Sequence, residues 1–394
     1  MRPTPGKGSS TIALQPVALP IYLTYFLRLG TFGFGGPIVL TSHMRKDLVD
    51  DRHWVSPEEF ENGLALAQLA PGPLAAQLAI FMGWVRFGVF GATLVAGAFI
   101  IPSFIAVLAL AMLYVNFSGL AWIQGAFYGI GAAVIAIMAL GVRKLVVKTI
   151  GKDPILWVIG SVSLAMTAVT EKEAVWVFLG AGVLNLLIRT PPKLPLQPKV
   201  RVVFPPWMVT GLSGAADGDK LWQVFVFFAK AGAFVFGSGL AIVPFLHGGV
   251  VHEHGWLNER QFIDAVAVAM ITPGPVVITV AFIGYLVAGG LGACAAALGV
   301  FLPCYLFVIV PAPYFQKYAK IPRIKAFIAG VTAAAVGAIA GAAIVLGRRA
   351  IIDVPTAIIC AVSVLALLKI KRLPEPLLIA GAGLVGLALK SALF

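Results

Sequence analysis

Two stretches, FLRLGTFGFGGP at residues 26–37 and LAQLAPGP at residues 66–73, decide how this chain is organised. Both return later in a weaker form, as FFAKAGAFVFGSG at 227–239 and ITPGP at 271–275. With a shift of 202 positions, 13 of the 48 consecutive columns that begin at Phe26 are identical. Chance does not align a tryptophan, an FxFG and a proline–glycine–proline at one offset, so the chain is two copies of one unit.

The composition places both copies in a membrane. The chain has 394 residues, of which 60% are hydrophobic and only 11% are charged, and its mean hydropathy is +0.97. A soluble domain carries about 25% charged residues, which excludes a soluble enzyme, a secreted disulfide scaffold and a disordered tail. The net charge of +13 does not indicate nucleic-acid binding, because Lys and Arg form short clusters between apolar runs, as in topology-setting loops.

The sequence divides into four parts. We predict an N-terminal tail, a first transmembrane repeat, a Pro- and Lys/Arg-rich cytoplasmic linker and a second transmembrane repeat, at residues 1–16, 17–188, 189–220 and 221–394. In each repeat an apolar segment with one basic residue (17–40 in the first) precedes an apolar segment split by PGP, and four further apolar segments follow.

The segment split by PGP determines the relative orientation of the repeats. Its two pieces are about 13 residues long, roughly 20 Å of helix, which is too short for either to cross a ~30 Å hydrocarbon core. A re-entrant hairpin leaves five crossings per repeat and inverts the repeats. It puts 20 of the 29 Lys and Arg residues on one side and 7 on the other, whereas six crossings per repeat give 15 against 12.

We therefore predict an all-α integral membrane protein with two inverted repeats. Each repeat has about five transmembrane helices and a PGP-broken re-entrant helical hairpin, and both termini lie outside. A thirteenth crossing through 202–216 would also invert the repeats, and this alternative stays open. Inverted repeats with broken helices are typical of secondary transporters, whose substrate lies near the midplane between the repeats.

Arg28 and its counterpart Lys230 are candidate substrate-binding residues. Each is the only charge in its apolar segment, about 15 Å of helix from either end, which is too deep for simple snorkelling. A cation inside the membrane is a functional-site hypothesis by default. The alternative is a structural ion pair with Glu61 or Asp264, the nearest acids at the membrane border.

The two PGP turns and two glycine-rich breaks complete the candidate site. New helices should begin at about Leu74 and Val276, and their free N–H groups would form an anion site in the membrane interior. A plain proline kink and close packing of small residues are the structural alternatives. The candidate residues in these segments are Gly35, Gly36, Pro37, Pro71, Gly72 and Pro73 in the first repeat, and Gly237, Ser238, Gly239, Pro273, Gly274 and Pro275 in the second.

Two cations and two helix starts describe a site for a small dianion, and no cofactor or metal site is expected. The sequence has no nucleophile elbow, metal-ligand spacing or phosphate-binding loop. The five histidines lie in polar loops and are interpreted as solvated or interfacial, with proton coupling or metal binding as the alternative. Glu61 and Asp264 are candidates for proton coupling.

At these residues the sequence resembles the chromate ion transporter family, in its long form with two homologous halves. The resemblance covers about 20–392 and implies efflux of chromate, with sulfate as a similar oxyanion, across the bacterial inner membrane. Matched by position, Arg28, the GGP at 35–37 and the PGP at 71–73 correspond to the family's N-terminal motifs. The second half departs from the GGP, so an equal share in the site is not implied. A homodimer is one arrangement that stays open.

The leading hypothesis is a secondary oxyanion exporter driven by the membrane potential. A passive anion channel would use the same cations and helix starts without alternating access. Proton-coupled transport of sulfate or another oxyanion is a further alternative. A membrane-embedded enzyme has no acid–base or nucleophile constellation to support it.

Overall fold

The computed structural model describes residues 14–33, 36–117, 121–170, 175–189, 216–234, 242–314, 322–370 and 373–391, and all regular elements in these ranges are helical. In chain order they are α1 Leu19–Phe32, α2 Gly36–Arg45, η1 Lys46–Asp51, α3 Pro57–Leu69, α4 Leu74–Phe117, α5 Ala121–Thr149, α6 Pro154–Thr170, α7 Val175–Arg189, α8 Ala216–Phe234, α9 Ile242–His247, η4 Gly248–Glu253, α10 Glu259–Ile271, η5 Val276–Ile278, α11 Thr279–Ile309, α13 Pro322–Ala350, α14 Val354–Lys369 and α15 Glu375–Ser391.

Long apolar helices confirm that this is an all-helical membrane protein. Four helical stretches of the described residues are long and apolar enough to cross a bilayer, and they are Leu74–Phe117, Gln124–Val147, Val276–Ile309 and Lys325–Ala350. Large apolar side chains such as Ile105, Val158 and Leu298 are exposed on the helices. Such a surface is stable only when lipid covers it.

The segment around the first PGP folds as a helical hairpin. Ser56 and Glu59 form a capping box that starts α3, with the Glu59 N–H donating to Ser56 Oγ over 3.1 Å. A Cβ added to Gly63 on α3 would lie 2.6 Å from Met82 Cε on α4. Nineteen residues of straight helix would separate these two positions by about 28 Å, so α4 runs back along α3.

A second reversal follows inside α4, where Phe87 and Gly88 leave helical geometry. A Cβ added to Gly83 would lie 3.0 Å from the Cβ of Val95, although 12 residues of straight helix span about 18 Å. The chain turns between them at Gly88, whose φ of +67° suits glycine. The second repeat has the same reversal in α11 at Gly289, with φ of +64°.

The first apolar segment, 17–40, also folds back, and the prediction that it crosses once is wrong. The Gln15 N–H donates to His53 O over 3.0 Å, and the rings of Tyr22 and Trp54 lie 5.7 Å apart. The end of η1 therefore lies beside the start of α1. The glycine-rich break at 33–36 separates α1 from α2 and permits this reversal.

The repeat is reproduced in this detail. The shift of 202 residues maps η1 onto η4 and α3 onto α10. The ring of Phe227 on α8 contacts Trp256 at 5.5 Å, and these two residues correspond to Tyr25 and Trp54, which lie 6.3 Å apart. Each repeat thus begins with two short helical hairpins, followed by longer apolar helices.

The ends of the long helices define two faces of the molecule. Face A holds Gln15, His53 and Arg86, which contact one another through the Gln15 backbone. After its reversal α4 runs about 40 Å to Phe117, which lies at face B. α5 returns by a similar length, so Asp153, which follows it, lies at face A.

Contacts between the repeats assign the second repeat to these faces. At face B, the Tyr114 hydroxyl donates to Asp264 Oδ2 over 2.8 Å, and the Tyr128 hydroxyl donates to Asp353 Oδ2 over 2.5 Å. Arg349 at the end of α13 pairs there with Glu259 at the start of α10.

The described residues on either side of the predicted cytoplasmic linker lie at opposite faces. Arg189 pairs with Asp153 at face A, whereas Lys220 Nζ lies 5.4 Å from the Trp256 ring at face B. Residues 190–215 between them lie outside the described residues. Near the two ends of the described chain, Gln15 lies at face A, and Gly386 of α15 packs on Gly125 near face B. The prediction that both termini lie outside stays a prediction.

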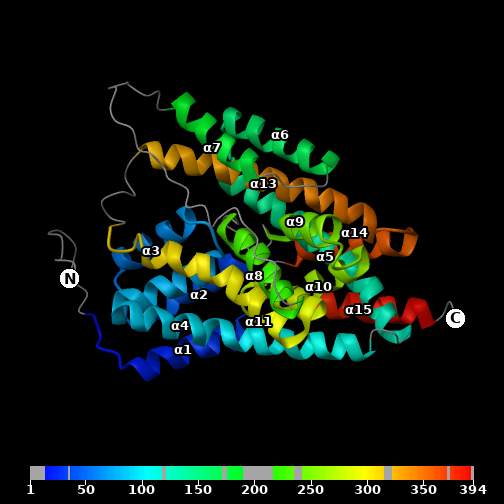
Figure 1. Ribbon diagram of the computed structural model, residues 1–394, viewed down its shortest axis with the longest axis horizontal. Coiled ribbons are helices and arrows are strands. Elements are labelled where there is room, and N and C mark those ends of the chain that lie inside the picture. The colour runs from blue at the N-terminus through cyan, green and yellow to red at the C-terminus, as the bar shows by residue number, and fades with distance from the viewer. Residues whose placement is uncertain are drawn as a thin grey trace.

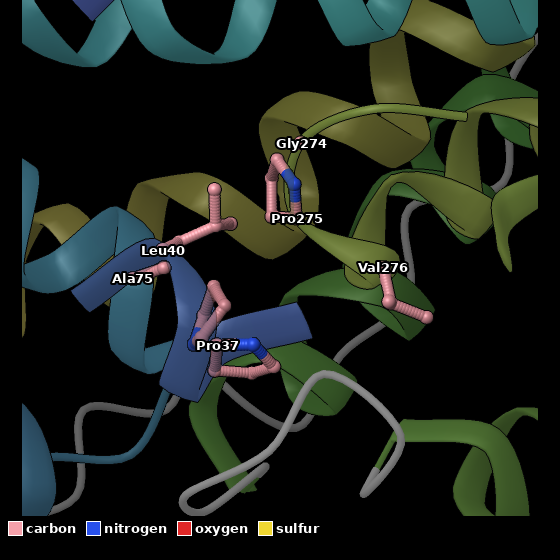
Figure 2. A pocket seen from close by; sticks show the side chains of 7 residues that line it. Pro37, Leu40, Ala75, Gly274, Pro275 and Val276 are labelled. Atoms are coloured by element: carbon pink, nitrogen blue, oxygen red, sulfur yellow. The ribbon is translucent and has the colours of Figure 1, made fainter. Parts of the chain in front are cut away.

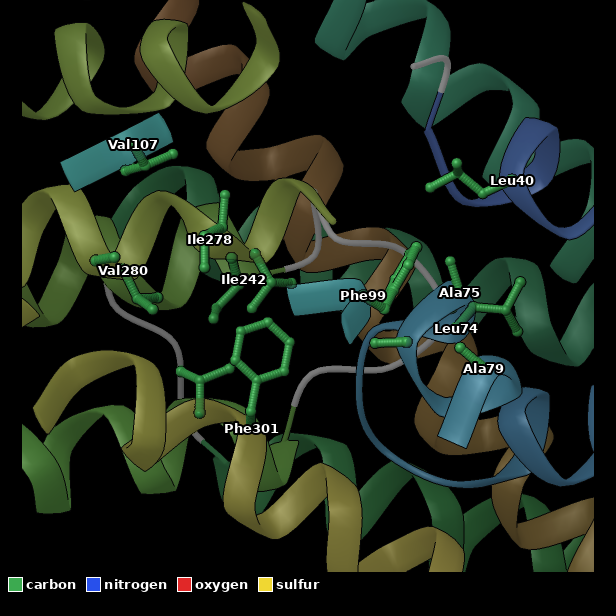
Figure 3. Close-up of a cluster of buried hydrophobic side chains, with 14 of the residues drawn as sticks. Leu40, Leu74, Ala75, Ala79, Phe99, Val107, Ile242, Ile278, Val280 and Phe301 are labelled. Carbon is green, nitrogen blue, oxygen red and sulfur yellow. The ribbon is translucent and has the colours of Figure 1, made fainter. Parts of the chain in front are cut away.

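The later helices of the two repeats interlock. α5 of the first repeat packs against α14 and α15 of the second, and α13 of the second repeat packs against α6 and α7 of the first. In Figure 1, α6 and α7 lie beyond α13 at one edge of the molecule, away from α4. Figure 3 shows that residues of both repeats, such as Phe99 and Phe301, share one buried cluster.

Candidate functional site

The two PGP turns end one helix and start another, as the sequence predicts. α4 begins at Leu74, directly after Pro73. In the second repeat, a 3₁₀ turn begins at Val276 and continues into α11 at Thr279. Gly72 has φ of +137° and Gly274 has φ of +96°, and an L side chain rarely adopts either value.

Both helix starts line one small cavity (Figure 2). Its walls are Pro37, Leu40, Pro73, Ala75, Gly274, Pro275 and Val276, so α2, the start of α4 and the second PGP turn all contribute. About 10 Å³ of it is accessible to the centre of a water-sized sphere, which is room for about one water molecule. The cavity is closed to a tetrahedral oxyanion as it stands.

Each turn packs against the other repeat. The Gly274 N–H donates to Gly33 O over 2.9 Å, and a Cβ added to Gly274 would lie 2.9 Å from Ser103 Cβ on α4. A Cβ added to Gly72 would lie 2.9 Å from Cys304 Sγ on α11, the counterpart of Ser103. The turns are therefore held in place by contacts between the repeats.

The electrostatics of the cavity come from the backbone. The first N–H groups of a helix have no partner within it, and each helix start carries about half a positive charge. Of the described residues that line the cavity, none has a charged side chain. Positive charge in this cavity would thus come from the starts of α4 and η5.

Arg28 and Lys230 do not line this cavity. Arg28 is exposed on α1, on the side away from Phe26 and Leu29, which are buried in the core. Lys230 is likewise exposed on α8. Both cations therefore lie on the outer faces of their helices.

The glycine-rich breaks are described only in part. Gly36 begins α2, and Pro37, in its first turn, lines the cavity. Gly35, Gly237, Ser238 and Gly239 lie outside the described residues. Pro71 is half-buried beside Gln77, which donates from Nε2 to Pro71 O over 2.6 Å.

The two candidate coupling carboxylates differ in their surroundings. The Glu61 side chain is 65% exposed and lies 3.7 Å from Arg45 Nη1. Asp264 is only 4% exposed and accepts the Tyr114 hydrogen bond at the floor of a polar pocket of about 170 Å³. Of the two candidate coupling carboxylates, only Asp264 is buried.

His247 is buried, so of the expected solvated or interfacial positions the solvated one does not hold for this histidine. It is 3% exposed, and its Nε2 lies 2.8 Å from Glu259 Oε2. Ligand atoms of His247, His252 and Glu259 lie within 4.8 Å of one another, a spacing compatible with a metal ion. Arg349 pairs with Glu259, so a cation already satisfies this carboxylate.

Sequence reasoning missed Gln77 and Ser103. Gln77 is fully buried, and its Oε1 is one of two buried side-chain atoms without a hydrogen-bond partner in the described residues. Ser103 donates to Gly30 O over 3.3 Å and contacts the second PGP turn. Each is an isolated polar residue in an apolar run, and this signal could have identified both.

A family model for chromate transporters matches residues 22–186 and again residues 222–387. The chain belongs to the chromate transporter family. It is 59% identical over 391 residues to a chromate transport protein of Cupriavidus metallidurans, with 98% of each chain covered. It is 53% identical to a probable chromate transport protein of Synechococcus elongatus, over 92% of this chain and 93% of the relative.

A more distant relative of this chromate transporter family member is a chromate transport protein of Pseudomonas aeruginosa. The identity is 31%, over 90% of this chain and 88% of the relative. No solved structure matches the chain. The two family matches coincide with the two copies found in the sequence.

Proposed function

We propose that this protein is a secondary transporter that exports chromate, and similar tetrahedral dianions such as sulfate, across the bacterial inner membrane. The observation that carries the proposal is that the helix starts at Leu74 and Val276, one from each repeat, line a single cavity. Two such starts together supply about one positive charge in a low-dielectric interior, which favours an anion. The names of the relatives support chromate as the substrate.

The closed cavity favours a carrier over a channel. A channel needs a continuous path, whereas this cavity holds about one water molecule and lies between contacts of the two repeats. Opening it toward one face requires movement of one turn against the other repeat. Such movement is alternating access around a site shared by the repeats.

The faces to which equivalent segments belong support the proposal of inverted repeats. The first repeat starts at face A, where Gln15 meets His53, and the second starts at face B, where Lys220 meets Trp256. The inversion thus depends on the chain changing faces between 189 and 216, which is the alternative of a crossing through 202–216. The hairpins at PGP are re-entrant, and each repeat contributes one to the site.

Charge supports face A as the cytoplasmic face. Basic residues of face A outnumber those of face B in the described part of the chain, as the positive-inside rule requires of the cytoplasmic side. Face A carries Arg45, Lys46, Arg52, Arg86, Arg143, Lys144, Lys152, Arg189, Arg323, Lys325 and Lys369, and face B carries Lys220, Arg260, Arg348 and Arg349.

The membrane potential suffices as the driving force. A dianion that leaves a cytoplasm at about −100 mV gains about 4.6 kcal/mol, since each charge contributes about 2.3 kcal/mol. This free energy corresponds to a concentration ratio of more than a thousandfold.

Uptake of radiolabelled chromate into inverted membrane vesicles tests the function. A lumen-positive potential should accelerate uptake, and uptake should saturate and be competed by sulfate. Linear uptake without competition would favour a channel, and no uptake beyond that of vesicles lacking the protein would reject transport.

Cysteine labelling tests the arrangement of the faces. We expect cysteines at Gln15 and Lys152 to react only from the cytoplasmic side, and cysteines at Lys220 and Asp353 only from the outside. Membrane-impermeant maleimide applied to intact cells and to inverted vesicles measures this. Labelling of positions 15 and 220 from the same side would contradict the inversion.

Arg28 and Lys230 are proposed to attract the anion to mid-depth, although they do not line the closed cavity. Arg28→Ala should lower chromate uptake at least about tenfold, or about 1.4 kcal/mol, and Arg28→Lys should lower it less because the charge remains. Lys230→Ala should have a smaller effect. Uptake normalised to inserted protein measures both, and a wild-type rate for Arg28→Ala would remove this residue from the pathway.

A further inference from the structure

We propose that Asp264, with Tyr114, forms a proton-binding site at face B that couples proton entry to anion export. This inference rests on the proposed function and adds a second transported ion to it. The site is the polar pocket of about 170 Å³ between the first turn of α10 and the junction of α4 with α5, lined by Tyr114, Gln124, Phe127, Asn258, Arg260, Gln261 and Asp264.

The pocket gives water access to a buried carboxylate. Its volume is many times that of the anion cavity and is enough for several water molecules. Arg260 and Asn258, which line it, are exposed and lie beside Trp256 at face B. A proton from external water can therefore reach Asp264, which is otherwise buried.

The groups that face Asp264 come from three elements. Tyr114 from α4 donates to its Oδ2, Arg260 lies one turn earlier on α10, and the neutral Gln124 comes from α5. α11, α13 and α15 also pack on α10, but none of their described residues lines the pocket. Arg349 of α13 is engaged by Glu259, one turn or more away.

The site is present in one repeat only. Under the shift of 202 residues, Asn62 of the first repeat takes the place of Asp264, so the equivalent position near face A has no ionisable group. At this position the two repeats therefore differ in an ionisable group. This asymmetry gives the transport cycle one proton-binding carboxylate, open toward face B.

α10 links this carboxylate to the anion cavity. Asp264 precedes Pro273 by nine residues, about 13 Å of helix, and Gly274 of that turn lines the cavity. The charged carboxylate binds the Tyr114 hydroxyl more strongly than the neutral acid does, so it holds α10 against α4. Proton binding weakens this attachment and frees the turn to move.

The exchange balances as one proton inward for one anion outward. The Asp264 carboxylate takes a proton from water at face B and becomes a neutral acid, and it returns the proton to water on the cytoplasmic side after the site has reoriented. No bond other than the O–H bond forms or breaks. Outward movement of a dianion and inward movement of a proton are both driven by a negative interior.

Inverted vesicles with the potential clamped at zero by potassium and valinomycin test the coupling. In these vesicles face B borders the lumen. A lumen about one pH unit more acid than the medium should drive about tenfold accumulation of chromate, because one pH unit is worth a factor of ten per coupled proton. A trapped pH dye should report alkalinisation of the lumen as chromate enters.

Asp264→Asn should abolish this accumulation and the dye signal while uptake driven by an imposed potential persists. Asp264→Glu should retain accumulation, and Glu253→Gln, which removes an exposed carboxylate of the same face, should behave as wild type. Loss of accumulation in both Asp264 variants would assign the residue a structural role and overturn the proposal. Potential-driven uptake without pH-driven accumulation in the wild type would overturn the coupling alone, whereas no uptake at all would reject transport.

Discussion

Ala75→Asp should reduce chromate transport by roughly 100-fold or more while the protein still inserts. Ala75 is 2% exposed, lines the cavity and is the second residue of α4. The helix start and its free N–H groups interact favourably with a carboxylate, which offsets part of the cost of burying it at this position. The same carboxylate would occupy the free N–H groups, and at about 4 Å it would repel a unit anion by about 4 kcal/mol at an effective dielectric constant of 20.

Ala75→Asn is the matched control, because it has nearly the same size without the charge. We expect it to retain at least about tenfold more transport than Ala75→Asp, a difference of about 1.4 kcal/mol. Potential-driven uptake into vesicles, normalised to inserted protein, measures both variants. If both variants had the same reduced uptake rate, the bulk of the new side chain rather than its charge would stop transport. The anion site would then have to lie elsewhere.

Gly274→Ala should destabilise the protein and abolish transport. Its φ of +96° costs a non-glycine residue about 1–3 kcal/mol, and the added Cβ would contact Ser103, which costs about 1–3 kcal/mol more. The Gly274 N–H would also be displaced from Gly33 O. Thermal unfolding in detergent should begin at a lower temperature than for wild type.

Two further variants separate the causes of this effect. Gly255→Ala has a comparable φ of +58° with nothing within 4 Å of the added Cβ, so it should cost less and leave transport intact. Ser103→Gly combined with Gly274→Ala should restore part of the stability, because it removes the contact but not the backbone strain. If Gly274→Ala matched Gly255→Ala in stability and transport, tight packing of the turn against the other repeat would have no role.

Local sequence signals predicted the parts of the fold that depend on local chemistry. The internal repeat is visible in the sequence itself. The end of a helix before each PGP and the helix starts at Leu74 and Val276 follow from the conformational limits of proline and glycine. Capping residues Ser56 and Asn258 mark the preceding helices in the same way. These features need no knowledge of neighbouring helices.

The direction of the chain after each break was not readable from the sequence. A glycine-rich break at 33–36 indicates that a helix ends, but a kinked crossing and a reversal have the same composition. Contacts of Tyr22 and Gln15 with residues beyond 50 decide for the reversal. Reversal of the first segment places the end of η1 beside the start of α1, at the face that also holds Gln15.

The surroundings of the charged residues could not be predicted from the sequence either. Arg28 is conspicuous as a lone cation in an apolar segment, yet its direction depends on which face of α1 packs on α4, and Phe26 and Leu29 take that face. Glu61 and Asp264 are both acids near the membrane border. Only the packing of Tyr114 from the other repeat distinguishes the buried one.

The interlocking of α5 with α14 and α15, and of α13 with α6 and α7, bears on how the protein is made. When the first repeat has left the ribosome, the surfaces of α5, α6 and α7 that pack on the second repeat have no partner yet and remain exposed to lipid. They stay so until nearly the whole polypeptide has been synthesised, since α15 ends only at Ser391. Assembly must therefore finish after translation, in a late step that docks one half-built bundle into the other.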